Sequence, residues 1–232
     1  TEKTNLMTKY ILTTLTISII SLLLIVQPDI GQTFLIVFSW SVLIFTSGIN
    51  IFILLAFFFS AIIFLTYLII YVPKFNYIQG RILSFFDRET GTHNFQSDKA
   101  IDSITSGGFF GKGIGEGILK NRVPEAHTDY IISVISEEFG VVAIMLILLL
   151  FLIFIYMVFK KISFETDDKI KLILIGSISL ILMQATIHIG VNIRLFPTTG
   201  MTLPFLSYGG SSIISTSILA GIILNLTKRK IN

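Results

Sequence analysis

The chain has 232 residues, of which 53% are hydrophobic and only 13% are charged, and its formal net charge is +3. This composition is far too apolar for an ordinary soluble domain, and the lack of cysteine excludes disulfides, thiol nucleophiles and cysteine-based metal sites. The basic residues lie at the ends of apolar runs rather than in a stripe with interleaved aromatic residues, so no nucleic-acid partner is expected.

Long apolar runs predict an all-α, polytopic transmembrane helix bundle. Each run is rich in Leu and Ile and lacks the two-residue alternation of a strand, which excludes an outer-membrane barrel. The run 51–72 is the clearest, whereas the second run is short and is interrupted by Ser39 and Ser41. We predict one membrane domain over residues 1–232, with six helices at about 9–26, 32–48, 51–72, 131–159, 170–193 and 204–227.

The basic residues also predict the orientation of these helices. Lysines and arginines cluster in three short segments: the first nine residues, 160–171 and 228–230. Short basic segments mark the cytoplasmic side of a membrane protein, and six crossings place all three segments on that side. The long polar stretch 73–130 is therefore expected to be an extracytoplasmic loop, and its length favours a functional role.

A glycine-rich run, SGGFFGKGIGEG, lies at 106–117 within this loop. Its spacing fits neither a nucleotide P-loop nor a dinucleotide fingerprint, because the required glycines are missing. Two interpretations stay open: a structural loop, or a loop that contacts a ligand. In the second case Lys112 and Lys120 could meet a phosphate or diphosphate as point charges.

The stretch VPEAHTDY at 123–130 concentrates titratable groups at the start of an apolar helix. Thr128 or Asp129 could simply cap that helix. Asp129 also begins a polar series of helical spacing with Ser133, Ser136 and Glu137, and ionisable groups near membrane depth tend to be functional. Asp129 is therefore a candidate general base, whereas His127 by itself is favoured as a hydrogen-bond partner that orients a neighbour. A metal site of Glu125, His127 and Asp129 is less favoured, because their spacing is not a helical ligand face.

Three further polar positions each have a structural and a functional interpretation. Asp29, in QPDIG, could cap a helix or line the outer end of a cavity. His188 lies inside an apolar helix and is expected to be a packing residue with a satisfied hydrogen bond. The small residues that follow Pro204 could serve close helix packing or line a polar substrate groove: Ser207, Gly209, Gly210, Ser211, Ser212 and Ser215.

Three stretches together resemble the SEDS family of bacterial cell-wall polymerases: LIVQPDIGQT, then SGGFFGKGIGEG with VPEAHTDYIISVISEEFG, then FPTTGMTLPFLSYGGSS. Their order and approximate spacing carry the resemblance over nearly the whole chain. The Gly-Met-Thr-Leu-Pro-Phe form of the last stretch is more similar to the division members of the family than to the elongation members.

The resemblance implies a peptidoglycan glycosyltransferase that joins lipid II units into glycan strands at the outer face of the inner membrane, at the division septum. It implies a class B penicillin-binding protein as partner, together with other membrane proteins of the division complex. Asp129 matches the family aspartate that deprotonates the acceptor sugar hydroxyl, and a divalent cation, Mg²⁺ or Mn²⁺, could assist the leaving diphosphate. The residues expected to bind the substrate are Gln96, Lys112, Glu125, His127, Thr128, Ser207, Gly209, Gly210 and Ser211.

The chain also departs from the family pattern. Family members commonly have ten helices and this chain matches the last six, so the resemblance implies that other helices complete the substrate cavity. Lys99 stands where a glutamine is common, His188 where asparagine is frequent, and Arg194 where some members have a small residue. Two other functions therefore stay open: a lipid II flippase, and a non-catalytic scaffold of the division complex.

Overall fold

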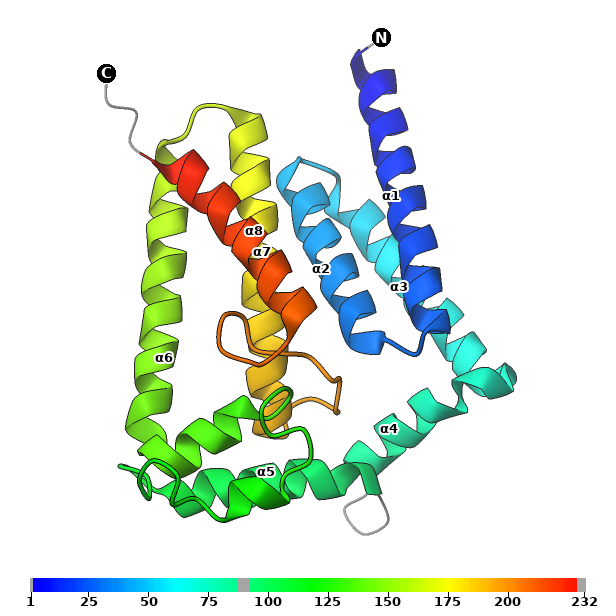
Figure 1. Cartoon of the computed structure of the whole chain (residues 1–232). Coiled ribbons are helices and arrows are strands. Elements are labelled where there is room, and N and C mark those ends of the chain that lie inside the picture. The colour runs from blue at the N-terminus through cyan, green and yellow to red at the C-terminus, as the bar shows by residue number, and fades with distance from the viewer. Residues whose placement is uncertain (1, 87–91, 229–232) are drawn as a thin grey trace. The chain divides into compact units, whose positions relative to one another are not determined.

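The computed structural model describes residues 2–86 and 92–228, and these residues form helices and turns without any strand (Figure 1). Contacts along the backbone divide the chain into two compact units, Thr1–Gln79 and Gly80–Asn232. The all-α prediction is confirmed.

The first unit contains three apolar helices: α1 (Glu2–Val26), α2 (Ile30–Thr46) and α3 (Ile51–Tyr71). The short η1 helix (Pro73–Phe75) and the start of α4 (Asn76–Phe86) follow. The side chain of Asp29 caps α2 by accepting a hydrogen bond from the Gln32 N–H at 2.9 Å. The capping interpretation of Asp29 is therefore confirmed, since an unpaired N–H at a helix start needs such an acceptor.

Within the part of the chain that the structure describes, five helices are long and apolar enough to cross a membrane: Thr8–Val26, Ile51–Tyr71, Ile131–Phe164, Asp168–Asn192 and Gly210–Thr227. The second predicted span, 32–48, is instead the 17-residue helix α2 at Ile30–Thr46, which falls short of that length. Many large apolar side chains of the membrane-spanning helices point outward, and Phe52 in α3 is 75% exposed. Such surfaces are stable in lipid, where the helix satisfies every backbone hydrogen bond internally.

The second unit holds α5 (Thr92–Gly107), η2 (Leu119–Arg122), α6 (Ile131–Phe164), α7 (Asp168–Asn192) and α8 (Gly210–Thr227). The stretch 73–130, predicted to be a loop, is therefore largely helical. Its main helix, α5, packs on α6 through Ser97, Ala100, Ser103 and Gly107, which are buried and share one helix face. A face of small residues carries no hydrophobic signal, which explains why this helix was not predicted.

Helix α6 is broken at Gly140, whose φ of 77° and ψ of −178° suit glycine alone. The first part of α6 lies along α5, and the second part turns sharply away beside α7 (Figure 1). The segment 108–113 enters this break, where Lys112 N–H donates to the Glu137 carbonyl at 2.9 Å and Val141 N–H donates to the Gly108 carbonyl at 3.0 Å. The glycine run thus replaces the helical hydrogen bonds that the break removes.

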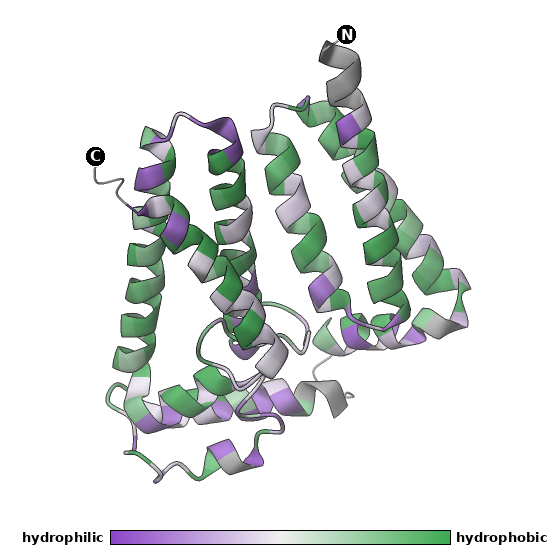
Figure 2. Cartoon of the chain, turned by 45° about the horizontal axis from the view of Figure 1, so that its top comes forward, coloured by the Kyte–Doolittle hydropathy of each residue, from purple (hydrophilic) through white to green (hydrophobic). Residues whose placement is uncertain are grey.

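The apolar part of the second unit is built from α6, α7 and α8. Val158, Leu174, Ile178, Ile181 and Ile223 form its buried cluster. Apolar residues dominate these helices, while the connection between α6 and α7 is polar (Figure 2). The last helix begins at Gly210 rather than at residue 204 as predicted, because residues 204–209 form a turn held by side chains of the site.

Candidate functional site

The turn 123–130 folds around one carbonyl group. Glu125 has a left-handed φ of 55°, and its carbonyl accepts hydrogen bonds from the N–H groups of Thr128, Asp129 and Tyr130 at 3.1, 3.0 and 3.3 Å. Tyr130 takes the N-cap position of α6, and no side chain caps the helix. The prediction that Thr128 or Asp129 caps this helix is therefore wrong, and the Asp129 carboxylate is not engaged as a cap.

Side chains from two other segments hold the backbone of this turn. Asn192 Nδ2, at the end of α7, donates to the Asp129 carbonyl at 3.0 Å. Ser207 Oγ donates to the Thr128 carbonyl at 2.7 Å and accepts from the Leu203 N–H at 2.8 Å. The Tyr208 N–H donates to the His127 carbonyl at 3.0 Å. These bonds fix the main chain at 127–129 while leaving the Asp129 side chain out of the network.

Asp129 occupies an environment that disfavours its charge. The residue is half-buried, and its Oδ2 atom lies against Gly200, where an added Cβ would be 3.5 Å away. Burial raises the pKa of Asp129 above its ordinary value, and the nearby negative charge of Glu125 raises this pKa further, while the Thr128 hydroxyl opposes both effects. A carboxylate with a raised pKa is a stronger proton acceptor, which is the property required of a general base.

Several residues near Asp129 were not predicted. Tyr130 is buried, which raises the pKa of its phenol, and its hydroxyl lies 3.5 Å from Ser97 Oγ. Arg81, in α4, donates from Nη1 to the Thr198 carbonyl at 3.3 Å. Arg194 pairs with Asp98 of α5. These partners are far apart in the sequence, so no local pattern pointed to them.

The polar series Ser133, Ser136 and Glu137 does not face Asp129. All three side chains are fully buried. The Ser103 hydroxyl of α5 donates both to the Ser133 carbonyl at 3.2 Å and to Glu137 Oε2 at 3.0 Å. Asp129 is therefore not part of one helical face with these residues as the spacing suggested, because α6 begins after Asp129 and helical spacing does not apply across its start.

Glu137 anchors the glycine-rich segment instead. Its Oε1 accepts from the N–H groups of Ile118 and Leu119, both at 3.0 Å, and its Oε2 accepts from the Lys120 N–H at 2.6 Å. Lys112 Nζ lies 3.4 Å from the same carboxylate, and Lys120 pairs with Glu138. The structural interpretation of the glycine run is thus supported, and contact of Lys112 with a phosphate stays a prediction that competes with Glu137.

The other predicted binding residues lie around this frame. Glu125 is exposed, and its Oε2 accepts a hydrogen bond from the Thr128 hydroxyl at 3.0 Å. Gln96 is half-buried in α5 beside Ser97, and Gly209 is half-buried before α8. The first residues of α8, Gly210 and Ser211, are exposed.

His188 is a packing residue, as predicted, although its Nε2 atom has no hydrogen-bond partner among the described residues. It is fully buried in α7, and its Nδ1 lies 2.7 Å from the Met201 carbonyl. Asn192, one turn later on α7, also donates to the His188 carbonyl at 2.9 Å. This face of α7 therefore ties the 201 segment and the Asp129 turn to one helix.

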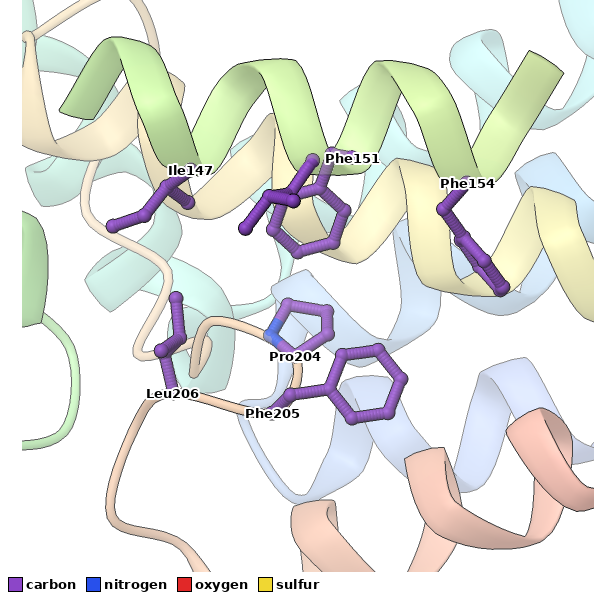
Figure 3. Close-up of a pocket in the computed structure, with 7 residues that line it drawn as sticks. Ile147, Phe151, Phe154, Pro204, Phe205 and Leu206 are labelled. Carbon is purple, nitrogen blue, oxygen red and sulfur yellow. The ribbon is translucent and has the colours of Figure 1, made fainter. Parts of the chain in front are cut away.

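An apolar groove lies between α6 and the segment 204–206 (Figure 3). Ile147, Phe151 and Phe154 of α6 face Pro204, Phe205 and Leu206 across a cavity of about 260 Å³. Leu206 also borders a second cavity, of about 410 Å³, with His127, Ile131 and Tyr208. The apolar groove and the cavity at the exposed His127 therefore share Leu206 in their linings.

The described residues contain no group of three or more His, Cys, Asp or Glu side chains placed to hold a metal ion. Glu125 and Asp129 offer two carboxylates whose like charges oppose each other. Mg²⁺ is commonly held by one or two carboxylates together with phosphate oxygens of the substrate. The donor set fits a substrate-assisted cation better than a metal ion held by the protein alone.

Comparisons with known proteins agree with one another. The family model for FtsW, RodA and SpoVE, described as cell cycle proteins, matches residues 1–232. A protein of Caulobacter vibrioides named "Probable peptidoglycan glycosyltransferase FtsW" is 35% identical, over 90% of this chain and 52% of its own length. An Enterococcus hirae protein of the same name is 30% identical, over 91% of this chain and 57% of its own length. The chain thus spans about half the length of the curated relatives it matches.

Two solved structures are also similar. One, from work titled "Structural coordination of polymerization and crosslinking by a peptidoglycan synthase complex", has a TM-score of 0.72 and 28% identity, over 94% of this chain and 60% of that one. The other is an aspartate-to-alanine variant of the rod shape determining protein RodA from Thermus thermophilus. It has a TM-score of 0.59 and 27% identity, over 94% of this chain and 55% of that one.

Proposed function

The chain belongs to the FtsW, RodA and SpoVE family of cell cycle proteins, and on this basis we propose that it serves the polymerisation of peptidoglycan. The substrate is lipid II, a disaccharide-pentapeptide carried on undecaprenyl diphosphate, and the product is a glycan strand. The relatives named as peptidoglycan glycosyltransferases support this reaction, and among them the division protein FtsW recurs. The reaction would take place at the outer face of the bacterial inner membrane, at the septum.

In this reaction Asp129 acts as the general base. The 4-hydroxyl of the acceptor sugar attacks the anomeric carbon of the donor sugar, and its proton passes to the Asp129 carboxylate. The bond from the anomeric carbon to the diphosphate breaks, and its electron pair leaves with the lipid diphosphate. The observation that carries the proposal is the environment of Asp129. Its carboxylate is half-buried, does not cap α6 and has a raised pKa, while Asn192 of α7 holds its backbone carbonyl.

Two features support a lipid-linked substrate. The turn that bears Asp129 directly precedes α6, one of the helices long enough to cross a membrane. The groove between α6 and Pro204–Leu206 has an almost wholly apolar lining (Figure 3). It shares Leu206 with the cavity at His127. A ligand with a polar head and a long apolar tail fits such a pair of cavities.

Glu125, the carboxylate that the proposal does not assign to proton transfer, would help substrate oxygens to hold a divalent cation. A bound Mg²⁺ or Mn²⁺ would neutralise charge that develops on the departing diphosphate. The two carboxylates repel each other without a cation, since Glu125 raises the pKa of Asp129.

The similar structure described as a peptidoglycan synthase complex supports a partner protein for this chain. We propose that the partner is a class B penicillin-binding protein, the transpeptidase that cross-links the new strands. Other membrane proteins of the division complex would join the same assembly.

Lipid II polymerisation in liposomes tests the proposal. The chain is combined with a class B penicillin-binding protein in two arms, one with and one without the N-terminal part of a relative. Asp129→Asn should lower the rate by at least about 100-fold, as the loss of a general base does. The matched control is Asp102→Asn, which removes an exposed carboxylate of α5 that pairs with Lys99.

The outcomes separate the rival functions. Strands that persist with Asp129→Asn would overturn the mechanism. Lipid II movement across the bilayer without strands would favour a flippase, and partner binding without either activity would favour a scaffold.

A further inference from the structure

Buried polar atoms without a hydrogen-bond partner gather near Asp129. Within residues 2–86 and 92–228, four of the six such side-chain atoms belong to the segment 188–199: His188 Nε2, Asn192 Oδ1, Arg194 Nη2 and Thr199 Oγ1. Buried polar groups are nearly always paired, because an orphaned group loses its hydration without compensation. A cluster of orphans beside a candidate base therefore calls for a ligand or for bound water.

Two of these four groups are donors in the turn after α7. Arg194 has a left-handed φ of 58°, a conformation that costs free energy for a side chain with a Cβ and tends to occur at functional sites. Its guanidinium pairs with Asp98, and its side chain is 17% exposed. Thr199 directly precedes Gly200, the residue that lies against the Asp129 carboxylate.

A second guanidinium approaches the same turn from α4. Arg81 Nη1 donates to the Thr198 carbonyl at 3.3 Å, one residue before Thr199. Arg81 is also close enough to Tyr130, the residue after Asp129, for its positive charge to favour the ionised phenol. Arg81, Arg194 and Thr199 thus border one short turn that contacts the candidate base.

We propose that Arg81, Arg194 and Thr199 form a binding site for the diphosphate group of a polyprenyl diphosphate. This assignment rests on the proposed function and gives it a group that receives the negative charge of the departing diphosphate. Arginine suits the role because its planar fork binds phosphate oxygens through two parallel hydrogen bonds. When the diphosphate enters, Arg194 exchanges Asp98 for the ligand, and Nη2 and the Thr199 hydroxyl gain the acceptors they lack.

The lysines of the glycine run fill this role less well. Lys112 and Lys120 are engaged by Glu137 and Glu138. Their ammonium groups would have to leave carboxylates that anchor the segment 106–120. The arginines border the turn that contacts Asp129. Asp98, the carboxylate paired with Arg194, is 45% exposed, so replacing it by a diphosphate costs less free energy than releasing Lys112 or Lys120.

Calorimetric titration of the full chain in non-ionic detergent tests the site. The probes are farnesyl diphosphate, farnesyl monophosphate and phosphatidylglycerol, which separate a diphosphate site from a general attraction to anionic lipids. The wild type should prefer the diphosphate, and Arg81→Gln and Arg194→Gln should each bind it roughly 10- to 100-fold more weakly, as expected for a lost charge-assisted hydrogen bond. Arg122→Gln is the matched control, because Arg122 is exposed in η2.

Asp98→Asn distinguishes ligand binding from a merely structural ion pair. A structural pair predicts that Asp98→Asn and Arg194→Gln weaken binding alike. The proposal predicts opposite results, since Asp98→Asn releases the guanidinium and leaves binding equal or tighter. Diphosphate binding by Arg81→Gln and Arg194→Gln that matches Arg122→Gln would overturn the proposal, as would equal binding of all three probes.

The same variants in the polymerisation assay keep the two proposals separable. Selective diphosphate binding in a chain that makes no strands would leave the site standing and refute the proposed function. Strand synthesis unaffected in Arg81→Gln and Arg194→Gln would do the reverse.

Discussion

Glu137→Gln replaces one carboxylate oxygen by an NH₂ group, and it should weaken the attachment of the glycine-rich segment to α6. Every partner of the Glu137 carboxylate is a donor: three backbone N–H groups, the Ser103 hydroxyl and the Lys112 ammonium. A glutamine side chain has one oxygen, so its amide NH₂ must face a backbone donor in either orientation.

The loss can be worked from these contacts. In the better orientation the NH₂ group replaces Oε2, where Ser103 Oγ can turn to accept but the Lys120 N–H, now at 2.6 Å from the carboxylate, is orphaned. An orphaned buried donor costs about 1–3 kcal/mol, and the remaining bonds lose their charge assistance. We expect a total of about 2–4 kcal/mol, which corresponds to a roughly 30- to 1,000-fold larger equilibrium constant for opening of the segment.

Amide hydrogen exchange of the intact protein in detergent measures this opening directly at residues 118–120. Glu138→Gln is the matched control, because Glu138 accepts from only one backbone N–H, that of Gly115 at 3.1 Å, besides the Lys120 ammonium. The control should change exchange at 118–120 by less than about fivefold, because Glu138 accepts no hydrogen bond from the N–H groups of these three residues. Equal exchange in the two variants would refute the reasoning that Glu137 anchors the segment.

Three other substitutions follow from the same structure. Asp129→Asn should leave the protein as stable or more stable at neutral pH. The pKa of Asp129 is raised in the folded state, so its charge lowers the free energy of unfolding once the pH exceeds the pKa of Asp129 in the unfolded chain. Melting curves recorded across pH check this. For the same reason the wild-type rate should fall about tenfold per pH unit below a pKa higher than that of an ordinary aspartate, and a rate flat down to the ordinary value would contradict the raised pKa. Gly140→Ala should cost at least about 3 kcal/mol, because its backbone region excludes alanine and a Cβ would strike the Phe109 carbonyl, whereas Gly221→Ala in α8, with open space around it, should not destabilise in a denaturant titration. Ser207→Ala should cost about 1–3 kcal/mol by orphaning the buried Leu203 N–H, while Ser211→Ala, exposed at the start of α8, should leave the melting temperature unchanged.

The apolar helices were predictable because lipid-facing helices carry their signal in every residue. Runs such as Ile51–Tyr71 need no partner to be recognised, and the predicted and observed bounds agree closely. Helix α5 was not predicted, since its buried face is made of Ser97, Ala100, Ser103 and Gly107. Their contribution is close approach to α6 rather than hydrophobicity, and only the presence of α6 reveals it.

The site was predictable only where its residues are neighbours in sequence. Asp129 stands out because titratable groups crowd one polar turn in an apolar chain. The groups that surround it come from afar: Asn192 is 63 residues away, and Arg81 reaches Thr198 over 117 residues. Arg194 was noted as unusual for the family, but its pairing with Asp98 could not be read from the sequence.

The two acidic residues that sequence spacing joined, Asp129 and Glu137, separate by what their neighbours offer. Glu137 is fully buried, yet five donors converge on it, so its charge is used to hold the segment 106–120 against α6. Asp129 is less buried, but its described polar neighbours are one donor, the Thr128 hydroxyl, and the like negative charge of Glu125. Hydrogen-bond donors stabilise the charged form of a carboxylate. A carboxylate with few donors therefore has a stronger tendency to accept a proton than one that is surrounded by donors. This difference supports the proposal that Asp129 accepts the proton, whereas Glu137 anchors the segment 106–120 that leads into the Asp129 turn.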